Sequence, residues 1–290
     1  MKGNGKDFVA YSLTDIGRKR GNNEDCFLYA ELEGRGGSGA YLMAVADGMG
    51  GHRGGEVASR RVIEVLEEYV TSNHLENIPE LLRGAIGEAN RSIYEMSHKV
   101  SNLQGMGSTC TAMFWIGGKI YVAHVGDSRA YLVRKGEVKK LTKDHTVAEE
   151  MIKSGMITPE KARVCPERNF LLRAVGTSSE IEVDLILPIN TKLGDVLVLC
   201  SDGLTEFVEE DEIREIVSLY PPDEACHILV NMANERGGSD NITVQVAKTW
   251  GSYGKTFQKL AGLKNIFVWI KSLKESFKDN TIKEVLSWMK

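Results

Sequence analysis

The segment WIGGKIYVAHVGDSRAYLVRKGEVKKL, residues 115–141, constrains the fold of this chain more than any other feature. Its apolar runs are short and rich in Val, Ile and Tyr, and the dipeptides Gly117-Gly118 and Lys135-Gly136 separate them. Glycine-containing dipeptides between β-like runs are typical of tight hairpin turns. We therefore predict consecutive hairpins, and with them antiparallel sheet, in the middle of the chain.

The order of strand-like and helical segments favours a sandwich. The β-like segments are 8–13, 26–32, 40–46, 109–116, 120–125, 129–134, 181–187, 195–200 and 242–248. Helical periodicity is present in 56–72, 79–100, 209–219 and 222–236. Because strands and helices do not alternate regularly, a doubly wound parallel sheet is disfavoured. The sequence predicts an α+β fold, a four-layer αββα sandwich of two antiparallel β-sheets flanked by helices.

The composition excludes several classes of protein. The 290 residues are 42% hydrophobic and 26% charged, as in globular proteins, and a net charge of −4 disfavours a protein that coats nucleic acid. Five scattered cysteines without a C-x-x-C pair argue against a disulfide framework. The N-terminal residues lack a signal-peptide core, and no stretch reaches the roughly 18 apolar residues of a membrane span. We expect a cytoplasmic protein.

Charge divides the chain into two parts. Residues 251–290 carry eight lysines against three acidic residues, whereas residues 1–250 are acidic overall. Leu263, Phe267 and Ile270 recur at helical spacing among the lysines, which predicts a basic amphipathic helix. This extension either packs back on the preceding domain or docks to anionic lipid or to a partner protein. Docking to lipid would place the protein at the periphery of a membrane.

The glycine-rich segment VADGMGGHRGG, residues 45–55, could bind phosphate through its backbone or a metal through Asp47. A phosphate loop requires G-x-x-x-x-G-K-[ST], or G-x-G-x-x-G before a helix, and the segment contains neither. A literal G-x-G-x-x-G begins at Gly34, but a strand-like run follows it. Nucleotide binding is therefore the weaker hypothesis.

Aspartates recur at the edges of apolar strands, at Asp25, Asp47, Asp127, Asp202 and Asp240. A buried carboxylate without a partner costs several kcal/mol. Because few cations are nearby in the sequence, a hard divalent metal with oxygen ligands is the partner that this pattern favours. Any one of these aspartates alone could instead cap a helix or form a turn.

A series of motifs then points to a family. GRKRGNNED, VADGMGGH, GMGSTCTAMF, VGDSRAYL, LTKDH, NFLLRAVG, LCSDGLTE and ERGGSDNITV follow one another along the chain. Over residues 8–248 the sequence resembles the metal-dependent Ser/Thr protein phosphatases of the PP2C type (PPM family), in their bacterial branch. The resemblance implies a helix-flanked β-sandwich that hydrolyses phosphoserine and phosphothreonine on proteins with a metal-activated bridging water. It also implies phosphoprotein substrates and a bacterial Hanks-type Ser/Thr kinase whose signals the enzyme reverses.

The resemblance also implies the metal ligands. Two core Mn²⁺ or Mg²⁺ ions would be bridged by Asp47, and the backbone carbonyl of Gly48 would help to hold one of them. Asp202 and Asp240 would complete the shell of the first ion. The full implied set of ligands is Glu24, Asp25, Asp47, Gly48, Asp127, Asp202 and Asp240.

Within this set, Glu24 and Asp25 would act on the second ion mostly through bound waters. Asp127 would share a third, weaker ion with Asp202, as in many bacterial members of the family.

Arg20 occupies the position of the family's phosphate-binding arginine, and a guanidinium can bind a phosphate dianion through two hydrogen bonds. His52 is expected either to donate a proton to the leaving oxygen or to contact the substrate. His124 and His145 are interpreted as structural.

The segment 144–178 is predicted to be a short helical insertion that corresponds to the family's flap, which borders the active site. The predicted domains are thus a phosphatase domain at 1–250 and a helical extension at 251–290. We expect a monomer that does not bind nucleic acid. The alternative is a phosphatase-like module that binds phosphoproteins without turnover. The presence of Asp47, Asp202 and Asp240 favours the enzyme.

Overall fold

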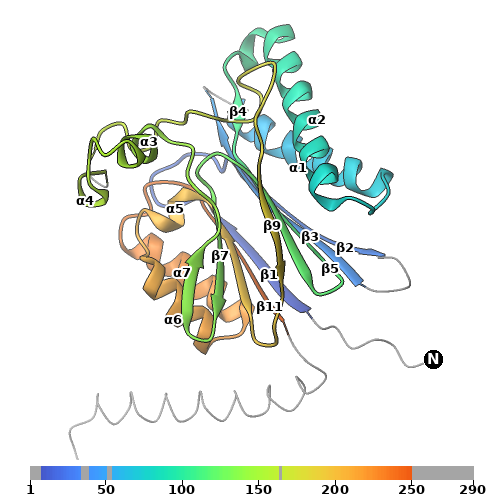
Figure 1. Cartoon of the computed structure of the whole chain (residues 1–290). Helices are drawn as coiled ribbons and strands as arrows, with labels where there is room; N and C mark the ends of the chain where they lie inside the picture. The colour runs from blue at the N-terminus through green and yellow to red at the C-terminus, as the bar shows by residue number, and fades with distance from the viewer. Residues whose placement is uncertain (1–7, 34–38, 51–53, 163–164, 250–290) are drawn as a thin grey trace, which may run out of the picture. The chain divides into compact units, whose positions relative to one another are not determined.

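The computed structural model of this chain describes residues 8–33, 39–50, 54–162 and 165–249. Their strands form two antiparallel sheets (Figure 1). The first sheet has the order β1-β11-β10-β7-β8. The second has the order β2-β3-β5-β6-β9, with the short strand β4 paired to β3. Strands that are neighbours in a sheet are therefore often far apart in the sequence.

The bounds of the strands follow the apolar runs. The first sheet contains β1 (Phe8–Asp15), β7 (Arg129–Arg134), β8 (Glu137–Lys140), β10 (Val196–Cys200) and β11 (Ile242–Thr249). The second contains β2 (Asp25–Glu33), β3 (Gly39–Met49), β4 (Gly107–Ser108), β5 (Cys110–Ile116), β6 (Lys119–Val125) and β9 (Asp184–Asn190). The predicted hairpins correspond to β5-β6 and β7-β8.

Helices cover the outer face of each sheet (Figure 1). Helices α1 (Gly54–Ser72) and α2 (Ile78–Lys99) pack on the second sheet, and the short 3₁₀ helix η2 (Ser101–Leu103) follows them. Helices α5 (Asp202–Thr205), α6 (Glu210–Leu219) and α7 (Pro222–Glu235) pack on the first sheet. A third apolar cluster, which includes Met43, Met113 and Leu199, lies between the sheets. The predicted αββα sandwich is confirmed.

The segment 144–178, called the flap from here on, carries two short helices, α3 (Val147–Lys153) and α4 (Pro159–Ala162). The hydroxyl of Thr146 accepts a hydrogen bond from the backbone N–H of Glu149 and so caps α3. The backbone N–H of Val147 donates to the carbonyl of Phe170, which ties the start of the flap to its return. Capping of α3 and backbone hydrogen bonds between the two ends of the flap give the flap its structure.

Several elements differ from the sequence-based prediction, among them β9 and α5. The strand predicted at 181–187 is β9, which begins three residues later because Asp184 is the first residue that pairs with β6, opposite His124. Helix α5 was not predicted, because its four residues are too few to show a helical period.

The residues Phe8–Thr249 form one compact unit. No helix in this described part of the chain is both long and apolar enough to cross a membrane. The predicted extension at 251–290 lies outside the described residues, as do the glycine-rich segment that begins at Gly34 and the side chain of His52. The prediction for His52 therefore stays a prediction.

Candidate metal centre and active site

Strands of the second sheet place Asp25 and Asp47 side by side. The two residues are directly opposite each other in the antiparallel pairing of β2 with β3. The backbone of Asp47 is fixed by the polar start of the β4-β5 segment. Its N–H donates to Thr109 Oγ1 at 2.8 Å, and its carbonyl accepts from the Thr109 N–H at 2.8 Å and from Ser108 Oγ at 2.9 Å. Asp47 thus has a fixed backbone at the end of a buried strand.

Gly48 extends this end of β3 toward the start of α1. A Cβ atom at Gly48 would lie 2.0 Å from the carbonyl oxygen of Gly55 and 2.7 Å from that of Glu24. The Gly48 N–H donates to the Glu24 carbonyl at 3.1 Å. Only glycine permits this approach of backbones, so the glycines that could have suggested a phosphate loop instead bring three segments together next to Asp47.

The first sheet contributes Asp202 and Asp240. Asp202 begins α5, with only Ser201 between it and β10, and Asp240 lies two residues before the start of β11. A Cβ atom at Gly203 would lie 2.1 Å from the carbonyl oxygen of Asn241, so the start of α5 lies directly against the start of β11. This contact holds the two aspartates on neighbouring backbones.

Asp127 follows β6 in the loop toward β7, and it is 8% exposed. Burial raises its pKa well above the usual value, and repulsion from Asp202 contributes. Asp202 and Asp127 also line one pocket together. The loop therefore brings Asp127 to the same site as Asp202.

The raised pKa values of these carboxylates reflect burial and also repulsion between them, because they lie close together. Burial raises the pKa of Asp47 well above its usual range, and the four aspartates Asp25, Asp202, Asp127 and Asp240 raise it further. Burial likewise raises the pKa of Asp25 to about 7 and that of Asp202 to about 6, with repulsion from Asp240 acting on both. Carboxylates held this close together require protons or cations to offset their charge.

The donor chemistry of this cluster fits divalent cations. Its donors are carboxylate oxygens, which Mg²⁺ and Mn²⁺ prefer. One oxygen of Asp25 and one of Asp202 are buried without a hydrogen-bond partner. The ligand geometry is not in place, however: among the described residues, no group of three His, Cys, Asp or Glu side chains is already arranged to hold a metal ion.

Arg20 and Glu24 lie at the rim of the cluster. Arg20 Nη2 donates to Asp240 Oδ2 at 2.6 Å, and the Arg20 side chain is 48% exposed. Burial raises the pKa of Glu24, the charge of Arg20 opposes this shift, and Asp240 adds to it. The structure thus brings the predicted phosphate-binding arginine to the carboxylates, where its guanidinium contacts Asp240.

Two residues of the site were not identified from the sequence. Ser201 Oγ donates to Asp25 Oδ2 at 2.7 Å and accepts from the Thr243 N–H at 2.9 Å, so it links the two sheets. Asn241 accepts from the Glu24 N–H at 2.8 Å and donates to the carbonyls of Ile16 and Asn22. Both directly adjoin motif aspartates, Asp202 and Asp240, and that adjacency was the available signal.

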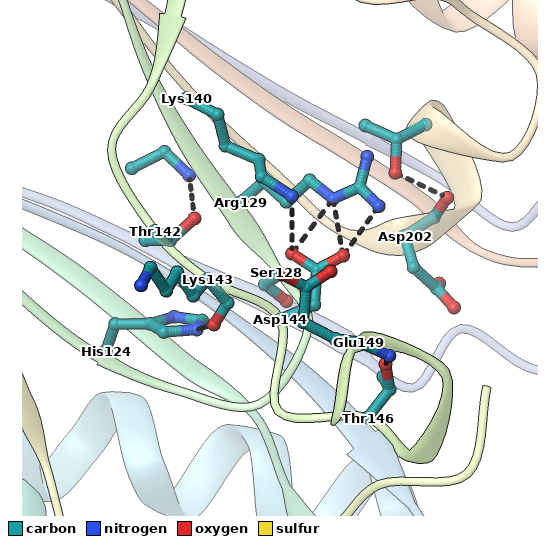
Figure 2. A network of polar contacts seen from close by, with 12 residues as sticks. His124, Ser128, Arg129, Lys140, Thr142, Lys143, Asp144, Thr146, Glu149 and Asp202 are labelled. Atoms are coloured by element: carbon teal, nitrogen blue, oxygen red, sulfur yellow. Dashed lines mark hydrogen bonds and ion pairs between the residues drawn. The ribbon is translucent and has the colours of Figure 1, made fainter. Parts of the chain in front are cut away.

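A pocket of about 410 Å³ opens next to Asp127 and Asp202. The flap forms one wall, and the segment around α5 forms the other. Arg168 of the flap contacts Glu206, just after α5, at 2.5 Å. At the floor, Arg129 donates to both oxygens of Asp144, and Figure 2 shows this pair together with Asp202. The flap therefore borders a pocket that reaches the carboxylate cluster.

Comparison with known proteins identifies the family. Residues 9–151 match the model of Protein phosphatase 2C. The Serine/threonine phosphatase stp of Listeria monocytogenes is 39% identical over 237 residues, which are 80% of this chain and 92% of that protein. The chain belongs to the PP2C family. The Serine/threonine protein phosphatase PstP of Mycobacterium tuberculosis is 39% identical over 250 residues, which are 86% of this chain, and the chain spans about half of that relative's length, 46%.

Solved PP2C structures share the fold. The structure of PstP/Ppp from Mycobacterium tuberculosis matches with a TM-score of 0.75 at 36% identity. The match covers 84% of this chain and 99% of the PstP/Ppp chain. The phosphatase of S. agalactiae has a TM-score of 0.77 at 36% identity and covers 83% of this chain and 99% of its own. The catalytic domain of PstP, in complex with two manganese ions, has a TM-score of 0.73 at 35% identity and covers 84% of this chain and 99% of its own. The resemblance stated from the motifs is thereby confirmed.

Proposed function

We propose that this chain hydrolyses phosphoserine and phosphothreonine on proteins in a metal-dependent reaction. The observation that carries the proposal is the convergence of aspartates from both sheets on one site, where Asp47 is repelled by Asp25, Asp127, Asp202 and Asp240. A module that only bound phosphoproteins would have no need to keep these charges together. The relatives are named as Ser/Thr phosphatases, which supports an enzyme and not a binding module.

The residues proposed to hold two core ions are Glu24, Asp25, Asp47, Gly48, Asp202 and Asp240. Bound Mn²⁺ or Mg²⁺ supplies Lewis-acid polarisation of the phosphoryl group and lowers the pKa of water. The aspartates of the two sheets would fix the position of the ions. The backbone of Asp47 is tied by Thr109, and the backbones next to Asp202 and Asp240 are tied by the contact of Gly203 with Asn241. We assign a third, weaker ion to Asp127 and Asp202.

Arg20 is proposed to bind the phosphoryl oxygens of the substrate. Its guanidinium is half exposed and one of its nitrogens contacts Asp240, so it lies at the carboxylate cluster and remains accessible from solvent. A guanidinium fork can donate two hydrogen bonds to one phosphate. Arg20 would thereby orient the phosphoester and offset charge that the aspartates would otherwise repel.

The phosphoproteins on which the enzyme acts are proposed to include a Hanks-type Ser/Thr kinase and its substrates. We propose that it acts as a monomer in the cytoplasm and that residues 251–290 attach it to an anionic membrane surface or to a partner. These assignments follow from the family resemblance and from the lysines of the extension.

Turnover of a phosphothreonine peptide across a manganese titration tests the proposal. We expect activity to require Mn²⁺ or Mg²⁺ and to disappear with excess chelator. Asp47→Asn and Asp202→Asn should each lower kcat by roughly two to three orders of magnitude, because each removes a charge from the ion-binding cluster.

Asp211→Asn is the matched control, because this aspartate is 84% exposed on α6 and contacts only Arg214 among the described pairs. It should keep wild-type turnover. Full activity in excess chelator would exclude the metal mechanism, and absence of turnover on phosphopeptides at saturating metal would favour the binding module.

A further inference from the structure

Gly126 decides where the Asp127 carboxylate points. It has a φ of +109°, which residues with a side chain rarely adopt, and a Cβ atom there would lie 2.6 Å from Thr109 Cβ. A glycine has no side chain of its own to hold this conformation. The orientation of the next residue, Asp127, therefore depends on what fixes the peptide groups of Gly126.

His145 binds both polar backbone groups of Gly126. The His145 N–H donates to the Gly126 carbonyl at 2.7 Å, and the Gly126 N–H donates to His145 Nδ1 at 3.1 Å. The two residues are 19 positions apart, and His145 is 5% exposed. One buried side chain and its own backbone thus hold the glycine from both ends.

The contact with Gly126 also determines the tautomer of His145. A backbone N–H can only donate, so Nδ1 carries no proton and the neutral ring carries its proton on Nε2. Nε2 lies 3.3 Å from Asp184 Oδ2, without a formed hydrogen bond. Asp184 is held in turn by Arg173 Nη1 at 2.8 Å. The carboxylate therefore favours the tautomer that can accept from Gly126.

His124 supports the His145 ring from one side. The two ring centroids are 4.7 Å apart. His124 Nε2 contacts the carbonyl of Lys143 at 2.9 Å, and its Nδ1 contacts Thr111 Oγ1 at 2.9 Å. Figure 2 shows His124 beside Lys143, which directly precedes Asp144, the first residue of the flap. The contact of His124 with the Lys143 carbonyl thus fixes the backbone two residues before His145.

His145 is also joined to the return of the flap. The Leu172 N–H donates to the His145 carbonyl at 2.7 Å, and the next residue is Arg173, which holds Asp184. A movement of this return segment would therefore act on the residue that clamps Gly126.

We propose that His145 is a positioning residue, which clamps Gly126 so that Asp127 is held beside Asp202 and which joins this placement to the return segment of the flap. The consequence for metal binding at Asp127 rests on the proposed function, whereas the clamp itself does not. His145 does not touch the reacting atoms, and its effect passes through Gly126.

Amide hydrogen exchange of Gly126, measured on the full chain with chelator present, tests the clamp without activity. His145→Leu keeps a similar volume but has no acceptor, and we expect Gly126 to exchange at least about tenfold faster in this variant. His145→Asn places an acceptor close to the position of Nδ1 and should stay within about threefold of wild type. His227→Asn, at an exposed histidine of α7, is the matched control.

The second measurement is the binding of Mn²⁺, followed by the paramagnetic resonance signal of the free ion. We expect His145→Leu to weaken the weakest Mn²⁺ site by about tenfold and His145→Asn to restore most of it. If His145→Leu does not fold, Asp184→Ala replaces it and should also speed exchange of Gly126, because the Nε2–H tautomer loses the nearby carboxylate charge that favours it.

Unchanged Gly126 exchange in His145→Leu, or in Asp184→Ala where the former does not fold, overturns the proposal. A lack of phosphatase turnover in the wild type would refute the proposed function instead, and it would leave the exchange result unaffected.

Discussion

His124 is a fully buried imidazole on β6, and its protonation is unfavourable in the folded protein. Burial lowers its pKa to about 4, and the nearby His145 contributes to the shift. Both ring nitrogens have partners, Thr111 Oγ1 and the Lys143 carbonyl. The folded protein therefore favours the neutral form of His124, whereas the same imidazole in the unfolded chain takes up a proton near pH 6.5.

This difference predicts a dependence of stability on pH. The contribution of His124 is fully present above pH 6.5, decreases as the pH falls, and is lost once the pH reaches about 4, because the unfolded state binds the proton first. The full effect corresponds to about 3 kcal/mol of unfolding free energy. Urea unfolding of wild type and His124→Gln at pH 7 and pH 4.5 measures it. The wild type should lose more stability than the variant, and equal losses would contradict the buried neutral ring.

At the scale of elements, the site depends on α5 and β11 lying against each other. The carbonyl oxygen of Asn241 occupies the space that a side chain at Gly203 would need, at 2.1 Å from its Cβ. The obstacle is backbone, so it cannot rotate away as a side chain would. The spacing of Asp202 and Asp240 thus depends on the absence of one methyl group.

Gly203→Ala should therefore separate α5 from β11. We expect a loss of about 1–3 kcal/mol in unfolding free energy from overpacking, and a larger proportional loss of turnover because Asp202 and Asp240 move apart. Urea denaturation and phosphopeptide turnover measure the two effects.

Gly87→Ala is the control for this substitution. Apart from its chain neighbours and the backbone of its own helix, no atom lies within 4 Å of a Cβ at Gly87, which is inside α2. The change should therefore stabilise the protein by about 0.5–1 kcal/mol and leave turnover unchanged. Wild-type stability and turnover in Gly203→Ala would show that the helix and strand can move apart without cost.

At the scale of the whole molecule, Thr249 at the end of the last strand is hydrogen-bonded to the segment before β10. Its N–H donates to the Asp195 carbonyl at 3.0 Å, and its hydroxyl donates to the Lys192 carbonyl at 2.7 Å. These contacts tie the end of β11 to the turn before β10. The compact unit Phe8–Thr249 contains each of the proposed metal ligands and Arg20.

A chain of residues 1–250 should therefore keep phosphatase turnover close to that of the full chain. If the lysines of 251–290 dock to lipid, only the full chain should co-sediment with anionic vesicles, and high salt should release it because screening weakens exposed charge contacts. Equal sedimentation of both chains at low salt would contradict lipid docking. Loss of turnover on truncation would show that the extension is part of the phosphatase fold.

Much of the fold could be predicted from the sequence because its signals are local. The apolar runs and glycine turns of residues 115–141 predicted the hairpins β5-β6 and β7-β8, and helical periodicity predicted α1, α2, α6 and α7. The aspartates at strand edges and the motif order pointed to the carboxylates that the structure brings together. These patterns extend over a few residues, so a single segment is sufficient to show them.

The chemistry of the site was thus determined by the sequence itself, which specified acidic oxygens at the ends of buried strands and the order of the elements that present them. Only the tertiary structure decided which backbones meet. Ser201 reaches Asp25, Asn241 binds Glu24, and His145 clamps Gly126. The physical reason is that these contacts join segments separated by 19 to more than 200 residues, and they form only once the sheets are paired and packed.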